Sequence, residues 1–155
     1  MIQVKDVVKS FDGNVVLDHI SANFEEGKVN MIIGQSGSGK TVLMKSMIGL
    51  HPINSGEIIF DTRNGQQNLA AMSEKEVRML HREVGMLFQG SALFDSMTVQ
   101  ENVMFPLEMF SQMSKEEMVE RARFCLSRVD MPERAYSLMP SEISGGMQKR
   151  VAIAR

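Results

Sequence analysis

The chain has 155 residues, which is enough for one compact domain and too few for two ordinary ones. With 43% hydrophobic and 23% charged residues, its composition is that of a globular protein and excludes a disordered one. The net charge of −2 provides no basic surplus for nucleic acid, so any anion site must be local.

The scattered chemical residues exclude several other classes of protein. A single cysteine, Cys125, excludes an intramolecular disulfide framework and suits a reducing compartment, and the three histidines lack metal-ligand spacing. No apolar run approaches the ~18–20 residues that cross a bilayer, and the N-terminus lacks the pattern of a signal peptide. A membrane partner is still compatible with this composition.

The first third of the chain predicts an α/β unit. Short apolar or alternating runs predict strands at 2–8 and 16–24, with a turn at 11–14 between them. The nearly continuous apolar run 29–33 predicts a strand buried on both faces of a sheet. A helix is expected over 40–50, where apolar residues recur at helical spacing and Gly49 and Pro52 follow.

Further along, 57–60 and 84–88 are expected to be strands, and 62–68 a polar loop. Three pairs of a hydroxyl residue and a glutamate three positions later predict capping boxes that open helices; the pairs are Ser73 with Glu76, Thr98 with Glu101, and Ser114 with Glu117. The stretch to residue 129 is almost wholly helical in pattern, and a last helix begins near Gly145. We therefore expect an α/β core over 1–90, a helical subdomain over 91–144 and the start of a further helix over 145–155.

A glycine-rich segment between the predicted strand 29–33 and the following helix matches the phosphate-loop pattern G-x-x-x-x-G-K-[ST]. Its members are Gly34, Gln35, Ser36, Gly37, Ser38, Gly39, Lys40 and Thr41. The glycines permit left-handed backbone angles, so that successive N–H groups can surround a phosphate, and the helix start adds its positive dipole end. Lys40 would reach the terminal phosphates of a nucleotide, and the Thr41 hydroxyl would bind Mg²⁺.

The alternative is a glycine-rich turn with an incidental lysine, which the strand before and the helix after make the weaker interpretation. The motif does not choose among GTPases, kinases, helicases and transport ATPases. A second helix start is prepared for an anion at Ser144, Gly145 and Gly146, although alone it would be interpreted as an ordinary capped helix.

The order of Phe11, the phosphate loop, Gln89 and then Ser144-Gly145-Gly146 resembles the ATP-binding cassette (ABC) family over the whole chain. The resemblance implies an α/β P-loop core with an antiparallel β subdomain and a helical subdomain, and ATP and Mg²⁺ as cofactors. Phe11 would stack on adenine, the alternative being a turn aromatic that packs in the core. Gln89 would sense Mg²⁺ and the attacking water.

Ser144, Gly145 and Gly146 would contact ATP held by a second copy in a head-to-tail dimer. The residue after the two glycines, usually glutamine, is Met147, and Phe11 stands where tyrosine is common. The run 88–103 resembles the ATPase subunit of bacterial phospholipid transporters, which implies a membrane permease, a lipid-binding protein of the mammalian-cell-entry type and a place on the cytoplasmic face of the cell membrane. Leu93, Phe94 and Met97 in this run would form an interaction patch or pack in the core.

The resemblance to the ABC family implies an apolar strand ending in Asp-Glu after the helix that begins at Gly145, with the glutamate as general base. No apolar run followed by Asp-Glu comes after residue 144, so no residue is assigned this role. We accordingly expect this stretch alone to bind ATP weakly and to hydrolyse it negligibly, as a truncated part of a longer protein. Two other functions stay open: a non-transport cassette protein acting on ribosomes or DNA, and a nucleotide-binding module without hydrolysis.

Overall fold

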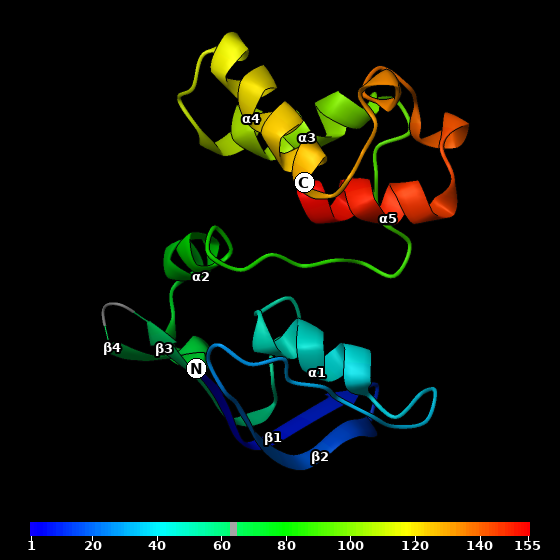
Figure 1. Cartoon of the computed structure of the whole chain (residues 1–155). Coiled ribbons are helices and arrows are strands. Elements are labelled where there is room, and N and C mark those ends of the chain that lie inside the picture. Colours follow the sequence, from blue (N-terminus) through cyan, green and yellow to red (C-terminus); the bar gives the residue numbers. More distant parts are fainter. Residues whose placement is uncertain (63–64) are drawn as a thin grey trace. The chain divides into compact units, whose positions relative to one another are not determined.

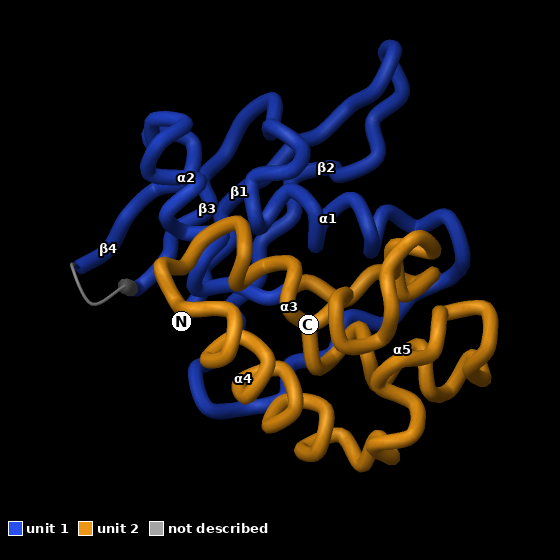
Figure 2. The backbone as a smooth tube through the Cα atoms, turned by 90° about the horizontal axis from the view of Figure 1, so that it is seen from above, with its two compact units in different colours: residues 1–85 blue, residues 86–155 orange. Residues whose placement is uncertain are grey.

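The computed structural model describes residues 1–62 and 65–155, which form two compact units, Met1–Gly85 and Met86–Arg155. Figure 2 shows the first unit in blue and the second in orange. The boundary between the units, after Gly85, lies close to the predicted boundary near residue 90, and the helix that begins at Gly145 belongs to the second unit.

The first unit is built on a four-stranded antiparallel sheet in the order β2-β1-β3-β4. Its strands are β1 (Ile2–Phe11), β2 (Asn14–Phe24), β3 (Ser55–Thr62) and β4 (Gly65–Asn68). The β1–β2 hairpin turns at Asp12 and Gly13, which both have positive φ, as a tight hairpin turn requires. The predicted strands at the N-terminus and at 57–60 are thus confirmed and extended.

Two α-helices and a short 3₁₀ turn accompany this sheet (Figure 1). Helix α1 (Lys40–Met47) buries Leu43 and Met47 in a core that includes Val7 and Leu17, and it ends before Gly49, whose φ is 77°. The 3₁₀ turn η1 (Leu69–Ala71) leads to α2 (Glu74–Leu80), which begins at the predicted capping box of Ser73 and Glu76.

Three predictions for the first 90 residues are wrong. Residues 29–33 form no strand, and Val29 and Ile33 are 95% and 84% exposed. Residues 84–88 are also irregular, with Leu87 and Phe88 exposed. A strand needs hydrogen-bonding neighbours, and among the described residues neither segment belongs to the sheet. The predicted polar loop 62–68 contains β4, which pairs with β3, while residues 63–64 of that loop lie outside the described residues.

The second unit is helical, as predicted. Its helices are α3 (Val99–Phe110), α4 (Lys115–Arg128) and α5 (Gly145–Ala154), with 3₁₀ turns η2 (Glu133–Ala135) and η3 (Pro140–Glu142) between the last two. Both predicted capping boxes, at Thr98 and at Ser114, are formed. The core packs apolar residues from the three helices, including Val103, Leu126 and Val151. None of the helices in the described part of the chain is long and apolar enough to cross a membrane.

Candidate functional site: a glycine-rich loop at the start of helix α1

The loop 34–39 turns at two glycines with left-handed backbone angles. Gly37 has a φ of 82° and Gly39 a φ of 85°. A Cβ atom on Gly39 would lie 2.9 Å from the carbonyl oxygen of Val16 and 3.1 Å from Leu17 Cδ2, so strand β2 approaches the loop too closely for a side chain. Both the backbone angle and the space therefore require glycine at position 39.

The side chain of Lys40 bends back over the loop that precedes it. Its ammonium donates hydrogen bonds to the carbonyl oxygens of Gly34 (2.8 Å) and Gln35 (2.6 Å). A Cβ on Gly34 would lie 2.7 Å from Ser38 Oγ, so the serine hydroxyl would have to turn away to make room for it. The geometry places a positive charge at the mouth of a narrow backbone cradle, which fits a phosphate group.

The first turn of α1 has no side-chain cap. Its N-cap residue is Gly39, and the first turn contains no acidic side chain. Backbone N–H groups at a helix start lack partners within the helix, and the dipole there favours an anion. Thr41, in this first turn, is exposed and available to a ligand.

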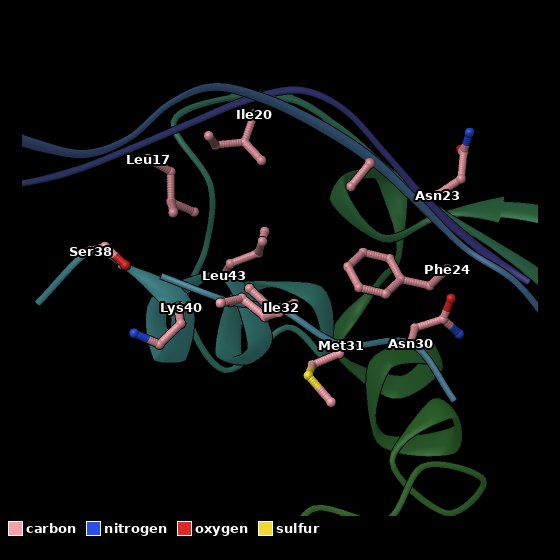
Figure 3. A pocket seen from close by; sticks show the side chains of 13 residues that line it. Leu17, Ile20, Asn23, Phe24, Asn30, Met31, Ile32, Ser38, Lys40 and Leu43 are labelled. Atoms are coloured by element: carbon pink, nitrogen blue, oxygen red, sulfur yellow. The ribbon is translucent and has the colours of Figure 1, made fainter. Parts of the chain in front are cut away.

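A cavity of about 440 Å³ adjoins the loop on the side of the sheet. Figure 3 shows Leu17 and Ile20 of β2 pointing toward Leu43 of α1 across it, with Lys40 at one end. Met31 and Ile32 line the cavity from the segment predicted as a strand. Apolar walls with a cation at one end are common in ligand sites.

Phe11 lies at the end of β1, beside the hairpin turn, and is 38% exposed. The Lys9 ammonium lies 4.7 Å from the centroid of its ring, and the ring of His51 meets it edge-on at 5.5 Å. The ring is thus partly free and in contact with two other side chains. Two residues apart on one strand, Lys9 and Phe11 share a face, so their spacing could have indicated this contact; His51 carried no such indication.

The second glycine-rich helix start, at α5, is capped by the side chain of Ser144. Ser144 is the N-cap, and its hydroxyl accepts a hydrogen bond from the Met147 N–H at 3.3 Å. Gly145 and Gly146 are exposed, and a Cβ on Gly145 would meet no atom within 4 Å. The helix start is open to solvent.

Gln89 is exposed in the irregular stretch before α3. The run after it is held by Asn102, which is fully buried and bonds the N–H of Phe94 as well as the carbonyl oxygens of Phe94, Met97 and Thr98. Arg155 also donates to the carbonyl oxygens of Ser91 and Ala92. Sequence reasoning missed both residues, because a buried asparagine and a distant arginine have no local pattern.

The apolar residues of this run have different fates. Leu93 packs against the core of the second unit, and Met97 is half-buried. Phe94 is 40% exposed, and its ring contacts that of Phe105 at a tilt of 55°, with 4.7 Å between the ring centroids. Of the two open interpretations, core packing therefore holds for Leu93, and Phe94 alone among the three is exposed.

These features define a nucleotide-binding domain of the phosphate-loop class. The family model for ABC transporters matches residues 17–155, and the chain belongs to that family. The ATP-binding cassette MJ0796, solved as a dimer in a post-hydrolysis state bound to ADP and Pi, superposes with a TM-score of 0.87 at 32% identity, over 99% of this chain and 68% of that one. The predicted ABC-type fold is confirmed.

Curated relatives with different transport roles are similarly close. The glutamine transport ATP-binding protein GlnQ of Escherichia coli is 42% identical over all of this chain and 62% of its own length. The phosphonates import protein PhnC of Fusobacterium nucleatum is 38% identical over all of this chain and 64% of its own, and the intermembrane phospholipid transport protein MlaF of E. coli is 36% identical over all of this chain and 56% of its own. The chain thus spans less than two thirds of these relatives.

Proposed function

We propose that this chain is the nucleotide-binding part of an ABC transporter ATPase. The ATPase would bind ATP and Mg²⁺ and couple ATP hydrolysis to transport. The main support is the loop 34–39. Its left-handed glycines and the bent-back side chain of the following Lys40 form an anion cradle at an uncapped helix start. ATP supplies the anion that this cradle fits, and relatives named as transport ATP-binding proteins support the assignment.

The residues of this chain have separate roles in that proposal. Lys40 would exchange its two loop carbonyls for the terminal phosphates, and the loop N–H groups would hold those phosphates in place. The exposed Thr41 hydroxyl would bind Mg²⁺, and Phe11 would stack on adenine. The resemblance to the family gives the exposed Gln89 the role of sensing Mg²⁺ and the attacking water. Mg²⁺, when bound, neutralises the charge that develops on the phosphates.

The direct test compares the ATP affinity of the Lys40→Ala variant with that of the wild type by calorimetric titration. Because hydrogen bonds to charged groups contribute most of the binding energy of a phosphate, we expect the ATP affinity of the variant to fall about 10- to 100-fold. Lys45→Ala is the matched control, since Lys45 lies in the last turn of the same helix. Equal ATP binding by the wild type and Lys40→Ala would exclude this cradle as the phosphate site.

The proposed assembly is a head-to-tail dimer on the inner face of the cell membrane, docked on an integral-membrane permease. MJ0796 is described as a dimeric ABC transporter cassette, which supports dimerisation here. In such a dimer Ser144, Gly145 and Gly146 would contact the ATP of the partner copy; their exposure and open surroundings fit that role. Crosslinking between two copies that appears only when ATP is added would support the dimer. A protein that stays monomeric both with and without ATP would count against it.

For the transported substrate we propose phospholipid or another lipid. The sequence of residues 88–103 supports this, as does similarity to MlaF and to the chloroplastic TRIGALACTOSYLDIACYLGLYCEROL 3 protein of Arabidopsis thaliana, 37% identical over all of this chain. A lipid-binding protein of the mammalian-cell-entry type would then be a third partner. Stimulation of ATPase activity in the permease complex by phospholipid, and not by glutamine or methionine, is the expected result; the reverse would reassign the substrate.

A further inference from the structure

The ring of Phe11 contacts two side chains that have no part in the proposed phosphate site. Lys9 is only 9% exposed, and its ammonium lies over the Phe11 ring at 4.7 Å from the centroid, within the range of a cation–π interaction. His51 meets the ring edge-on, with an interplanar angle of 81°. Because Lys9 is buried, its ammonium has fewer alternative positions than that of an exposed lysine, and its contact with the ring is more specific.

The backbone fixes these contacts in place. The backbone N–H of Ser10, between Lys9 and Phe11, donates to Asn54 Oδ1 at 2.8 Å, and Asn54 N–H donates to the Val8 carbonyl at 2.9 Å. These bonds tie the segment that carries His51 to strand β1. The Phe11 side chain therefore has neighbours whose own positions are set by the sheet.

We infer that Lys9 is a positioning residue for a nucleotide base: it covers one face of Phe11 and holds the ring, so that a base stacks on the other face. This rests on the proposed function, in which Phe11 contacts adenine. Phe11 is 38% exposed as a residue, which leaves area for such a contact. A ring that is already ordered does not have to lose side-chain freedom when the ligand binds.

This role predicts an effect that depends on the base. Lys9→Met should weaken ATP binding about three- to tenfold, the equivalent of ordering one side chain. It should change the affinity for inorganic tripolyphosphate, which has the phosphates and no base, by less than about twofold. Lys9→Arg keeps the cation over the ring and should restore most of the ATP affinity.

Lys5→Met provides a matched control for the lost charge, because Lys5 is exposed on the same strand. It should leave both affinities unchanged. In a Phe11→Ala background, Lys9→Met should have no further effect on ATP binding, because the ring that it positions is gone. Circular dichroism melts of each variant would verify that the sheet is folded.

The outcomes separate this inference from the proposed function. If the wild-type protein binds neither ATP nor tripolyphosphate, the proposed function fails and the inference fails with it. If the wild type binds both but Lys9→Met leaves ATP affinity unchanged, weakens both ligands equally, or adds its full effect to Phe11→Ala, then only the positioning role of Lys9 is overturned.

Discussion

Two helices of this protein begin at glycine-rich segments, and they begin in different ways. Helix α1 starts from Gly39 in a left-handed conformation, with no side chain to cap it. Helix α5 starts from Ser144 in an extended conformation, and the serine hydroxyl accepts a hydrogen bond from Met147 N–H. One of the free N–H groups of α5 is thereby satisfied within the chain, while the first turn of α1 depends on solvent or on a bound group.

The difference separates a start whose N–H groups are left to solvent or a ligand from one that a side chain caps. An N-cap serine contributes about 1 kcal/mol over alanine, while a glycine cap is only slightly inferior to serine because it leaves the N–H groups accessible. At α1 the glycine also brings β2 close, since any Cβ would collide with the Val16 carbonyl. These geometries fit the proposed roles, in which the start of α1 holds an anion closely and the start of α5 meets a ligand that approaches from outside.

The largest expected effect tests the requirement for glycine. Gly39→Ala should destabilise the first unit by about 1–3 kcal/mol and abolish ATP binding, because alanine is strained at a φ of 85° and its Cβ would lie 2.9 Å from a carbonyl oxygen. Urea unfolding followed by circular dichroism, with a parallel ATP titration, would measure both effects.

Gly145→Ala is the matched variant at the other helix start, where the space is open. It should leave stability within about 0.5 kcal/mol or raise it slightly, because alanine is the better helix former. Equal costs for the two substitutions would remove the distinction between the helix starts.

A smaller effect tests the cap of α5. Ser144→Ala should cost about 1 kcal/mol in the unfolding of the second unit, and it should speed amide exchange at Met147, whose N–H loses its acceptor. Ser144→Asp should retain most of the stability, because aspartate is an equally good N-cap. Unchanged exchange at Met147 in Ser144→Ala would show that the hydroxyl contributes nothing.

The smallest effect concerns acid. The pKa of Glu76 is lowered by hydrogen bonds from the Ser73 side chain and backbone, and the pKa of Glu101 by bonds from the Thr98 backbone and side chain. Lowered pKa values mean that the capping boxes of α2 and α3 stabilise fully above the ordinary value of 4.5, and that this stabilisation is lost as pH falls through the folded-state values.

Helix α1 has no titrating cap, so its first turn should not respond in that pH range. Amide exchange followed by NMR as pH is lowered would show fraying at the starts of α2 and α3 and none at the start of α1. Glu76→Gln should remove the pH dependence of α2 and leave that of α3. Simultaneous fraying of α1 would indicate global unfolding instead of loss of the boxes.

The sequence predicted the local features of the fold well. All three capping boxes are formed where the spacing of a hydroxyl residue and a glutamate placed them. Their partners are three residues apart, so the interaction is complete within one helical turn. The phosphate-loop pattern was visible for the same reason, since its backbone angles and its lysine contacts lie within residues 34–40.

The strand predictions failed where pairing decides the structure. The apolar residues 29–33 match a buried strand in pattern, but Val29 and Ile33 are exposed and no strand of the described residues pairs with them. Conversely, the polar residues 65–68 form β4, because backbone hydrogen bonds to β3 do not depend on apolar side chains. The apolar composition of a segment does not specify which strand, if any, pairs with it.

By itself, the sequence determined the anion cradle at Gly34–Lys40, the helix starts at Ser73, Thr98, Ser114 and Ser144, and through their order the family. Only the tertiary structure decided that β2 lies against Gly39, that Asn102 bonds the run after Gln89, and that Lys9 and His51 contact Phe11. The first set depends on residues within one or two turns of each other. The second depends on packing between distant segments, which a single sequence does not specify locally.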